Sequence, residues 1–416
     1  MSQNLNIPKH WQLVKVGEYV ISVKGKKPKR ISSIKTPECS IPYVNIKAFE
    51  KNLIDEFTDG IGCVLCEEGD FLMVWDGSRS GYVGKAIKGA LGSTLVRLKF
   101  PNIDTNYAYY FLQSKYIEIN TRAKGVGIPH VDPNLLWNYK LPIPPLQEQK
   151  TIVSKIEELL SDLENGKQQL LLAQQQLKIY RQSLLKWAFE GKLTSVRTGR
   201  DLSQKDGELP EGWKWAKITD IVENNKHSLK AGPFGSSLKK EFYVEKGYKI
   251  YGQEQVISDN AFFGDYYIDE EKYQELKSCQ IKPFDILISL VGTVGKVLIL
   301  PANCEKGLIN PRLIKITLNK DVYLHKFFKY YFESSYVKNF YGSKAQGTTM
   351  DVLNLGIIKT IPFPLPPFVE QQLIVDELES KLTVCDKIDE TISQSLQQAE
   401  TLRQSILKKA FEGKLI

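Results

Sequence analysis

The stretch P-I-P-P-L-Q-E-Q-K-T-I-V at residues 142–153 returns as P-L-P-P-F-V-E-Q-Q-L-I-V at residues 364–375. The endings match as well, because L-L-K-W-A-F-E-G-K-L closes at Leu193 and I-L-K-K-A-F-E-G-K-L closes at Leu415. The numbering offset is 222 at both ends (364 − 142 and 415 − 193), so the two segments have equal length without a gap. A duplicated segment of constant length predicts a structural element whose length itself matters.

Each copy is predicted to form one long helix. Pro144 and Pro145 fall where the first turn of a helix tolerates proline, and Gly191 is a typical stop. Apolar residues recur every seven positions, at Ile156, Leu163, Leu170, Leu177 and Leu184, and at Leu378, Cys385, Ile392, Ala399 and Ile406. A second set lies three residues further on, at Leu159, Gly166, Ala173, Tyr180 and Trp187, with Ile388 and Leu402 in the second copy. Five such heptads predict a coiled-coil seam about 68 Å long at ~1.5 Å per residue.

One alternative to a coiled-coil seam is open. Two unrelated amphipathic helices in a globular core would also show apolar periodicity, but they leave the matched length unexplained.

Gly166 falls in the predicted seam where its counterpart is Ile388, and a glycine there costs around 1 kcal/mol of helix stability relative to alanine. We expect Gly166 to permit a close helix crossing or to accommodate Ile388, so that Gly166→Leu weakens the helix pair.

The remaining sequence predicts two related globular domains. The first spans residues 1–141 and the second residues 208–363, with the long helices at 142–193 and 364–416 and a polar linker at 194–207. Short strand-like runs follow the same order in both, as in D-F-L-M-V-W (70–75) and D-I-L-I-S-L (285–290). The fold class is therefore α+β, with strand-rich domains that share an outline and differ in their loops, as recognition modules of different specificity would.

Bulk properties narrow the class of protein. The 416 residues carry a net charge of +8, which permits nucleic-acid binding without requiring it. No apolar run reaches membrane-spanning length and no signal-peptide core is present, so we expect a cytoplasmic protein. The six cysteines are then expected to be reduced.

The sequence lacks the usual catalytic motifs. Neither the four histidines nor the lone C-x-x-C at residues 63–66 completes a metal-ligand pattern, and no phosphate-binding glycine loop is present. Two E-x-K tripeptides at residues 270–272 and 275–277 suggest a nuclease only if a further acidic residue lies beside them. We therefore expect no catalytic residue, no metal and no cofactor bound by this chain.

Basic loops are more informative. V-K-G-K-K-P-K-R at residues 23–30 opens the first domain, and lysines surround G-P-F-G-S-S at residues 232–237 of the second. Lysines on loops neutralise phosphates, and glycine and serine let the backbone approach a duplex closely. A solvated loop is the alternative for each run, but two runs at matching positions of a repeated domain favour DNA.

Together these motifs resemble the specificity (S) subunit of Type I restriction-modification systems. The resemblance rests on the duplicated P-x-P-P-x-x-E-Q-x-x-I-V entries, G-P-F-G-S, G-T-T at residues 347–349 and the two A-F-E-G-K-L endings. It implies two target recognition domains, antiparallel long helices and pseudo-twofold internal symmetry. Each domain would read one block of a bipartite, asymmetric DNA sequence, and the helices would fix the gap between the blocks.

The resemblance also implies partners. Two modification subunits would dock on the helices and carry S-adenosylmethionine and the adenine methylation site, and restriction subunits would add the nuclease that depends on ATP and Mg. The Pro-Pro pairs of this chain, I-P-P-L and L-P-P-F, lack the Asp, Asn or Ser that precedes them in an adenine methyltransferase loop. The chemistry is therefore expected on other subunits.

Candidate DNA-binding residues are hydrogen-bonding side chains on glycine-flanked loops, because base edges need donors and acceptors that reach into a groove. They are Lys26, Lys27, Lys29, Ser78, Arg79 and His130 in the first domain and Lys230, Ser236, Ser237, Lys239, Gln346, Thr348 and Thr349 in the second. Two other functions stay open: a coiled-coil scaffold linking two protein-binding domains, and a stand-alone nuclease.

Overall fold

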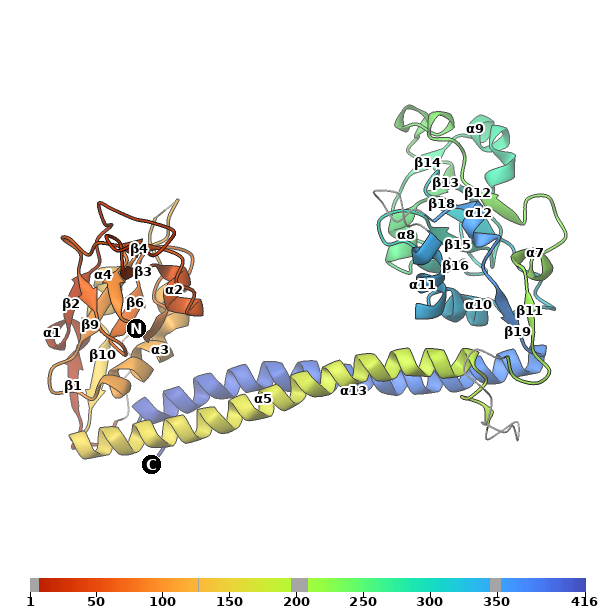
Figure 1. The fold of residues 1–416 in the computed structure, drawn as a ribbon. Coiled ribbons are helices and arrows are strands. Elements are labelled where there is room, and N and C mark those ends of the chain that lie inside the picture. Colours follow the sequence, from red (N-terminus) through yellow and green to blue (C-terminus); the bar gives the residue numbers. More distant parts are fainter. Residues whose placement is uncertain (1–6, 126, 196–208, 345–352) are drawn as a thin grey trace. The chain divides into compact units, whose positions relative to one another are not determined.

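The computed structural model describes residues 7–125, 127–195, 209–344 and 353–416. It forms two compact units, one made of Met1–Leu171 with Ser393–Ile416 and the other of Leu172–Ile392 (Figure 1). Each unit holds one globular head and one half of each long helix. We call residues 7–143 the first head and residues 209–365 the second head. Within the described residues, no helix combines the length and the apolar composition that a membrane span requires.

The first head contains two four-stranded sheets and the helix α3 (Thr105–Thr121). One sheet is antiparallel, in the order β2 (Ile21–Lys24), β9 (Leu95–Lys99), β6 (Phe71–Val74) and β7 (Val83–Lys85). The other has the order β4 (Phe57–Thr58), β3 (Ile41–Val44), β8 (Gly89–Leu91) and β5 (Leu65–Cys66), with β3 and β8 parallel. The short helices are α1 (Val16–Tyr19), α2 (Ile46–Lys51) and α4 (Pro133–Trp137).

The second head repeats this frame. Its antiparallel sheet has the order β12 (Leu229–Ala231), β18 (Leu313–Ile316), β15 (Ile286–Ser289) and β16 (Val297–Ile299). Its other sheet has the order β14 (Tyr267–Ile268), β13 (Tyr248–Tyr251) and β17 (Gly307–Ile309), with β13 and β17 parallel. The helices are α7 (Ile218–Ile221), α8 (Gln253–Ile257), α9 (Glu270–Glu275), α10 (His325–Phe332), α11 (Ser335–Lys344) and α12 (Leu355–Ile358), with 3-10 turns η1 (Gly235–Ser237), η2 (Lys240–Phe242) and η3 (Lys277–Cys279).

Alternating side chains explain why the strands in the matching D-F-L-M-V and D-I-L-I-S runs, β6 and β15, are buried throughout. Phe71 and Met73 belong to one hydrophobic cluster of the first head, and Leu72 between them belongs to another. Ile286 and Leu287 are divided between two clusters of the second head in the same way. Successive side chains of a strand point to opposite faces, so each head has a core on both sides of its central strand.

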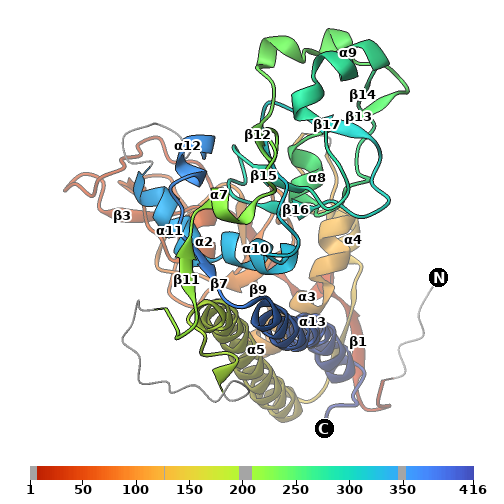
Figure 2. The same ribbon diagram turned by 90° about the vertical axis from the view of Figure 1, so that its right-hand side faces the viewer.

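The long helices are α5 (Leu146–Phe189) and α13 (Phe368–Phe411), each of 44 residues, as the repeat predicted. Within each unit their halves lie side by side (Figures 1 and 2). In the second unit Gln174 donates a hydrogen bond to Asp389 and Arg181 pairs with the earlier Asp386, so the helices are antiparallel. The predicted seam residues are all buried or half-buried: Ile156, Leu163, Leu170, Leu177, Leu184, Leu378, Ile392 and Ile406, with Cys385 and Ala399.

The second predicted set of seam positions is wrong at Gly166, Tyr180, Trp187, Ile388 and Leu402, which are exposed, whereas Leu159 and Ala173 are half-buried. Tyr180, Trp187, Ile388 and Leu402 are between 41% and 51% exposed. The positions that are buried or half-buried in every heptad lie four residues after the first set, at Leu160, Lys167, Gln174, Arg181 and Ala188, and at Leu382, Asp389, Leu396, Arg403 and Ala410. Heptad contacts alternate spacings of three and four, and the polar residues at these positions concealed the correct order from a search for apolar periodicity.

The expectation for Gly166 is also wrong. Gly166 is exposed, and a Cβ built on it meets no heavy atom within 4 Å. It therefore permits no close helix crossing. Gly166→Leu is now expected to leave the helix pair intact, because the added side chain enters open space.

The repeated entry motif attaches each head to the start of a long helix. In the first head the buried Gln149 accepts a hydrogen bond from the Asp104 backbone and donates one to the Pro144 carbonyl. In the second head its counterpart Gln371 makes the same kind of bonds to Leu324 and Pro366. Strand pairs support both attachments: β1 (Gln12–Lys15) with β10 (Lys140–Ile143), and β11 (Lys214–Ala216) with β19 (Phe363–Leu365).

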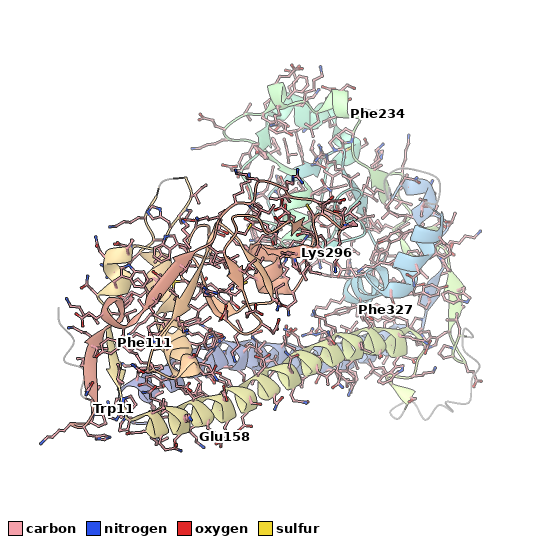
Figure 3. The ribbon with its side chains drawn as sticks, turned by 60° about the vertical axis from the view of Figure 1, so that its left-hand side comes forward. Trp11, Phe111, Glu158, Phe234, Lys296 and Phe327 are labelled. Atoms are coloured by element: carbon pink, nitrogen blue, oxygen red, sulfur yellow. The ribbon has the colours of Figure 1, made fainter. Side chains whose placement is uncertain are left out.

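The repeated A-F-E-G-K-L ending attaches each head to the end of the other long helix. Phe411 of α13 packs edge-on against Tyr107 and Phe111 of α3 in the first head. Phe189 of α5 packs edge-on against Phe327 and Tyr331 of α10 in the second head. Figure 3 labels Phe111 and Phe327 on these two head helices. Each head is thus held by the start of one long helix and the end of the other, which explains why both ends of the repeat are duplicated.

Candidate nucleic-acid interface

Loops at the ends of the strands meet on the first head. The Gly25 amide donates to the Leu95 carbonyl at 3.0 Å, and the Asp76 amide to the Thr94 carbonyl at 3.3 Å. The Gly77 amide donates to the Pro129 carbonyl at 2.7 Å, which brings in the loop before α4. We call residues 24–30, 75–80, 92–94 and 123–131, other than 126, the first loop cluster. Gly25 is required there, because a Cβ would lie 2.2 Å from the Gly92 carbonyl oxygen.

The first loop cluster contains all six residues predicted for this head. Lys26, Lys27 and Lys29 are exposed and make no ion pair within the part of the chain that the structure describes. Together with Arg30, which is also exposed and makes no ion pair among the described residues, they are the cations of this cluster that remain available to phosphates.

The other predicted residues of the first head are more constrained. Arg79 forms an ion pair with Glu50 at 2.9 Å and lies 4.1 Å from the centre of the Tyr82 ring. The backbone carbonyl of Ser78 accepts a hydrogen bond from Asn120, and Ser78 itself is exposed. The backbone of His130 pairs with that of Lys124, and its ring is half-buried. Arg79 therefore has a structural partner already, whereas Ser78 retains a free donor.

A second loop cluster occupies the same place on the second head. The Gly232 amide donates to the Leu313 carbonyl at 2.9 Å, and the Leu290 amide to the Arg312 carbonyl at 3.0 Å. We define it as residues 230–240, 252–254, 289–295 and 310–312. Gly232 corresponds to Gly25, since its Cβ would lie 1.9 Å from the Asn310 carbonyl oxygen. In both heads, therefore, two backbone segments approach each other closely at a glycine in the same position of the frame.

The described residues predicted for the second head lie in this cluster. Lys230 is half-buried on β12, opposite Lys315 in the strand pair, and Lys239 is exposed, 3.5 Å from Glu241. Ser236 and Ser237 form η1. Gln346, Thr348 and Thr349 lie outside the described residues.

The structure adds residues that the sequence did not indicate. Arg312 is exposed, and its guanidinium Nη1 donates to Gln253 Oε1 at 3.4 Å. Phe234 is 86% exposed, and Figure 3 shows it projecting from the second head. One signal existed for Arg312, because N-P-R at residues 310–312 occupies the position of G-S-T at residues 92–94.

The groups considered for catalysis have structural surroundings. The Cys66 thiol is buried against the Ile87 and Gly89 carbonyls, and burial raises its pKa to about 11, which keeps the thiol protonated and unreactive. In the E-x-K runs, Glu270 accepts a hydrogen bond from Tyr248, and Lys272 pairs with Glu275 at 2.7 Å. Within the described ranges, no group of three or more His, Cys, Asp or Glu side chains is placed to hold a metal ion.

Comparisons with known proteins agree on one family. The model of the Type I restriction modification DNA specificity domain matches residues 8–173 and again residues 210–398. The specificity subunit of Type I restriction enzyme MjaVIII from Methanocaldococcus jannaschii is 26% identical over 99% of this chain and 94% of its own length. The EcoDI specificity subunit from Escherichia coli is 23% identical over 98% of this chain and 89% of its own length.

Solved structures share the fold. A chain studied for complex assembly and conformational transition of the type I R-M system aligns with a TM-score of 0.71 and 19% identity, covering 98% of this chain and 99% of that chain. The HsdS subunit from Thermoanaerobacter tengcongensis aligns with a TM-score of 0.57 and 19% identity, covering 98% of both chains.

Proposed function

The chain belongs to the family of Type I restriction-modification specificity subunits, and we propose on that premise that each head reads one block of an interrupted DNA sequence while the helix pair sets the gap. The observation that carries this proposal is that the two heads have the same frame and different loops. The two heads share a strand frame and both attachments to the long helices, yet their strand-end loops carry different side chains.

Each loop cluster has the chemistry for a DNA duplex. Exposed Lys26, Lys27 and Lys29 supply charge for phosphates on the first head, and the second carries exposed Lys239, which also contacts Glu241 at 3.5 Å. The exposed hydroxyls of Ser78 and Ser236 supply hydrogen-bonding groups suited to base edges. Different donors on the same frame give each head its own target.

The helices suit the role of a spacer. At ~1.5 Å per residue, 44 residues extend about 66 Å, compared with roughly 34–36 Å for one turn of DNA. A helix resists bending far better than a loop does, so its length fixes a distance. This explains why the repeat keeps the same number of residues in both copies.

We propose further that two modification subunits dock on the helix pair and carry out adenine methylation with S-adenosylmethionine. Restriction subunits that use ATP and Mg join them, and the present chain contributes no catalytic group. Exposed apolar residues on the helices support docking: Leu172, Ile179, Tyr180, Trp187, Val384 and Ile388. Apolar surface of this kind usually marks a partner interface. The complex acts in the cytoplasm, where its DNA lies.

Methylome sequencing tests the proposal. Cells that carry this chain and its modification subunit are expected to methylate adenine in one asymmetric motif with an internal gap. Deleting the chain alone should abolish that methylation, and restoring it should return the same motif. An unchanged methylome after deletion would contradict a specificity function.

The spacer role has its own test. Removing one heptad from both long helices shortens each by ~10.5 Å, or about three base pairs at ~3.4 Å per pair. The gap between the methylated blocks should shorten by about three base pairs while the blocks themselves stay unchanged. A gap of constant length would show that something other than the helices sets it.

A further inference from the structure

The backbone of Arg312 is fixed from both sides. Its amide donates to Asn310 Oδ1 at 2.9 Å, and its carbonyl accepts from the Leu290 amide at 3.0 Å. Pro311 precedes it and restricts the backbone further. The side chain therefore leaves the second loop cluster from a well-defined point.

The side chain is held by one neutral contact. Arg312 Nη1 donates to Gln253 Oε1 at 3.4 Å. The amide nitrogen of Gln253 donates in turn to Ser289 Oγ at 3.0 Å and to the Val291 carbonyl. These two bonds require Gln253 to direct its oxygen towards the guanidinium. A chain of hydrogen bonds thus runs from the buried end of β15 to an exposed arginine.

The charge of Arg312 is not neutralised. Four other arginines form ion pairs, namely Arg79 with Glu50, Arg97 with Asp70, Arg122 with Glu118 and Arg181 with Asp386. No carboxylate lies within ion-pair distance of Arg312 in the described part of the chain. Its full charge and its remaining N–H donors face solvent.

We propose that Arg312 reads a guanine in the half-site of the second head and that Gln253 is its positioning residue. Guanine presents O6 and N7 in the major groove, and the arginine fork matches both acceptors. A glutamine orients the fork through one nitrogen and leaves the arginine charge intact. A carboxylate in its place would cancel that charge. This inference rests on the proposed function and names one specificity determinant within it.

The test uses the full chain reconstituted with its modification subunits. Binding is measured on a library in which each base pair of the wild-type motif is varied in turn. Arg312→Ala is expected to lose discrimination at one G·C pair, by roughly 5- to 150-fold, and to leave the block read by the first head unchanged. Arg312→Lys should lose part of that discrimination, because an ammonium lacks the fork. Gln253→Ala should weaken it at the same base pair by a smaller factor.

Lys320→Ala is the matched control, because Lys320 is an exposed cation of the second head outside the loop cluster. It should change no position of the motif. Equal weakening at all positions with a lower salt dependence would make Arg312 a phosphate contact and overturn the proposal, as would an unchanged motif in Arg312→Ala. Arg312→Lys guards against misfolding, since it retains size and charge. A wild-type complex without sequence preference would overturn the proposed function itself.

Discussion

In the first head Lys24 at the end of β2 forms an ion pair with Asp76 at 2.7 Å, whereas in the second head Arg312 is held by the neutral amide of Gln253. Both residues lie in a loop cluster at the same edge of the same strand frame. One cation is neutralised within the protein, and the other keeps its charge for a ligand. The frame therefore determines where a side chain lies, and its neighbours determine whether its charge is neutralised within the protein.

The heads also differ in how firmly they are attached. Phe411 is only 4% exposed against the first head, whereas its counterpart Phe189 is half-buried against the second. Gln149 makes two hydrogen bonds, whereas Gln371 makes three, the third to the Val322 carbonyl. The aromatic attachment is therefore stronger in the first unit and the hydrogen-bonded one in the second, and each difference can be measured.

The largest effect is expected from the aromatic attachment. Phe411→Ala should destabilise the first unit by about 3–5 kcal/mol, the usual cost of removing a buried phenyl ring, and Phe189→Ala should cost less in the second. Differential scanning calorimetry of the full chain measures both. Phe368→Ala, at a 40% exposed position of α13, is the control. Equal losses from both main variants would refute the asymmetry.

The next largest effect, a loss of DNA affinity, distinguishes phosphate contacts from base contacts. Replacing Lys26, Lys27 and Lys29 together with alanine should lower the slope of log affinity against log salt by about 2.7, or ~0.9 for each phosphate contact. Affinity at 0.15 M salt should then fall about a hundredfold, with the recognised motif unchanged. Lys88→Ala is the control, since this exposed lysine already pairs with Glu67. A changed motif would mean that these lysines contact bases.

For the buried glutamines the larger loss of stability is expected in the second unit, the reverse of the order expected for the phenylalanines. Gln371→Ala leaves buried partners unsatisfied and should cost about 1–3 kcal/mol, with a smaller loss for Gln149→Ala, which breaks fewer bonds. Chemical unfolding of the full chain provides the values. Gln372→Ala, on the exposed side of the same turn, should change little. A larger loss from Gln149→Ala would reverse the comparison.

The sequence predicted the features that repeat and missed those that depend on contacts across the fold. Helix length, the first set of seam residues and the basic loops were visible because periodicity and composition are local properties. Gln253 and Arg312 lie 59 positions apart, and Glu50 is remote in sequence from Arg79, so only the folded sheets bring these partners together. That these residues lie on loops could be predicted, whereas their ion pairs with side chains remote in sequence could not.

Most of the second set of seam positions failed for a related reason. The correct positions include Lys167, Gln174 and Arg181, which a search for apolar residues passes over. Long polar side chains bury their aliphatic stems and keep their polar ends at the edge of a seam. Gln174 and Arg181 bond to Asp389 and Asp386 of the neighbouring helix. Exposed Tyr180 and Trp187 looked like better seam residues, although they face away from it.

The smallest expected effect compares the two halves of the helix pair. Arg181 and Asp386 lie 2.6 Å apart in the second unit, and the offset of 222 relates them to Arg403 and Glu164 in the first. Among the described residues Arg403 makes no ion pair, and Glu164 accepts a hydrogen bond from Gln168 instead. A double-mutant cycle should give a coupling of roughly 0.2–1 kcal/mol for Arg181 with Asp386, because Asp386 is 70% exposed. The equivalent cycle for Arg403 with Glu164 should give about zero. Equal couplings would mean that the two halves of the helix pair are held alike, and that the ion pair of the second unit does not distinguish them.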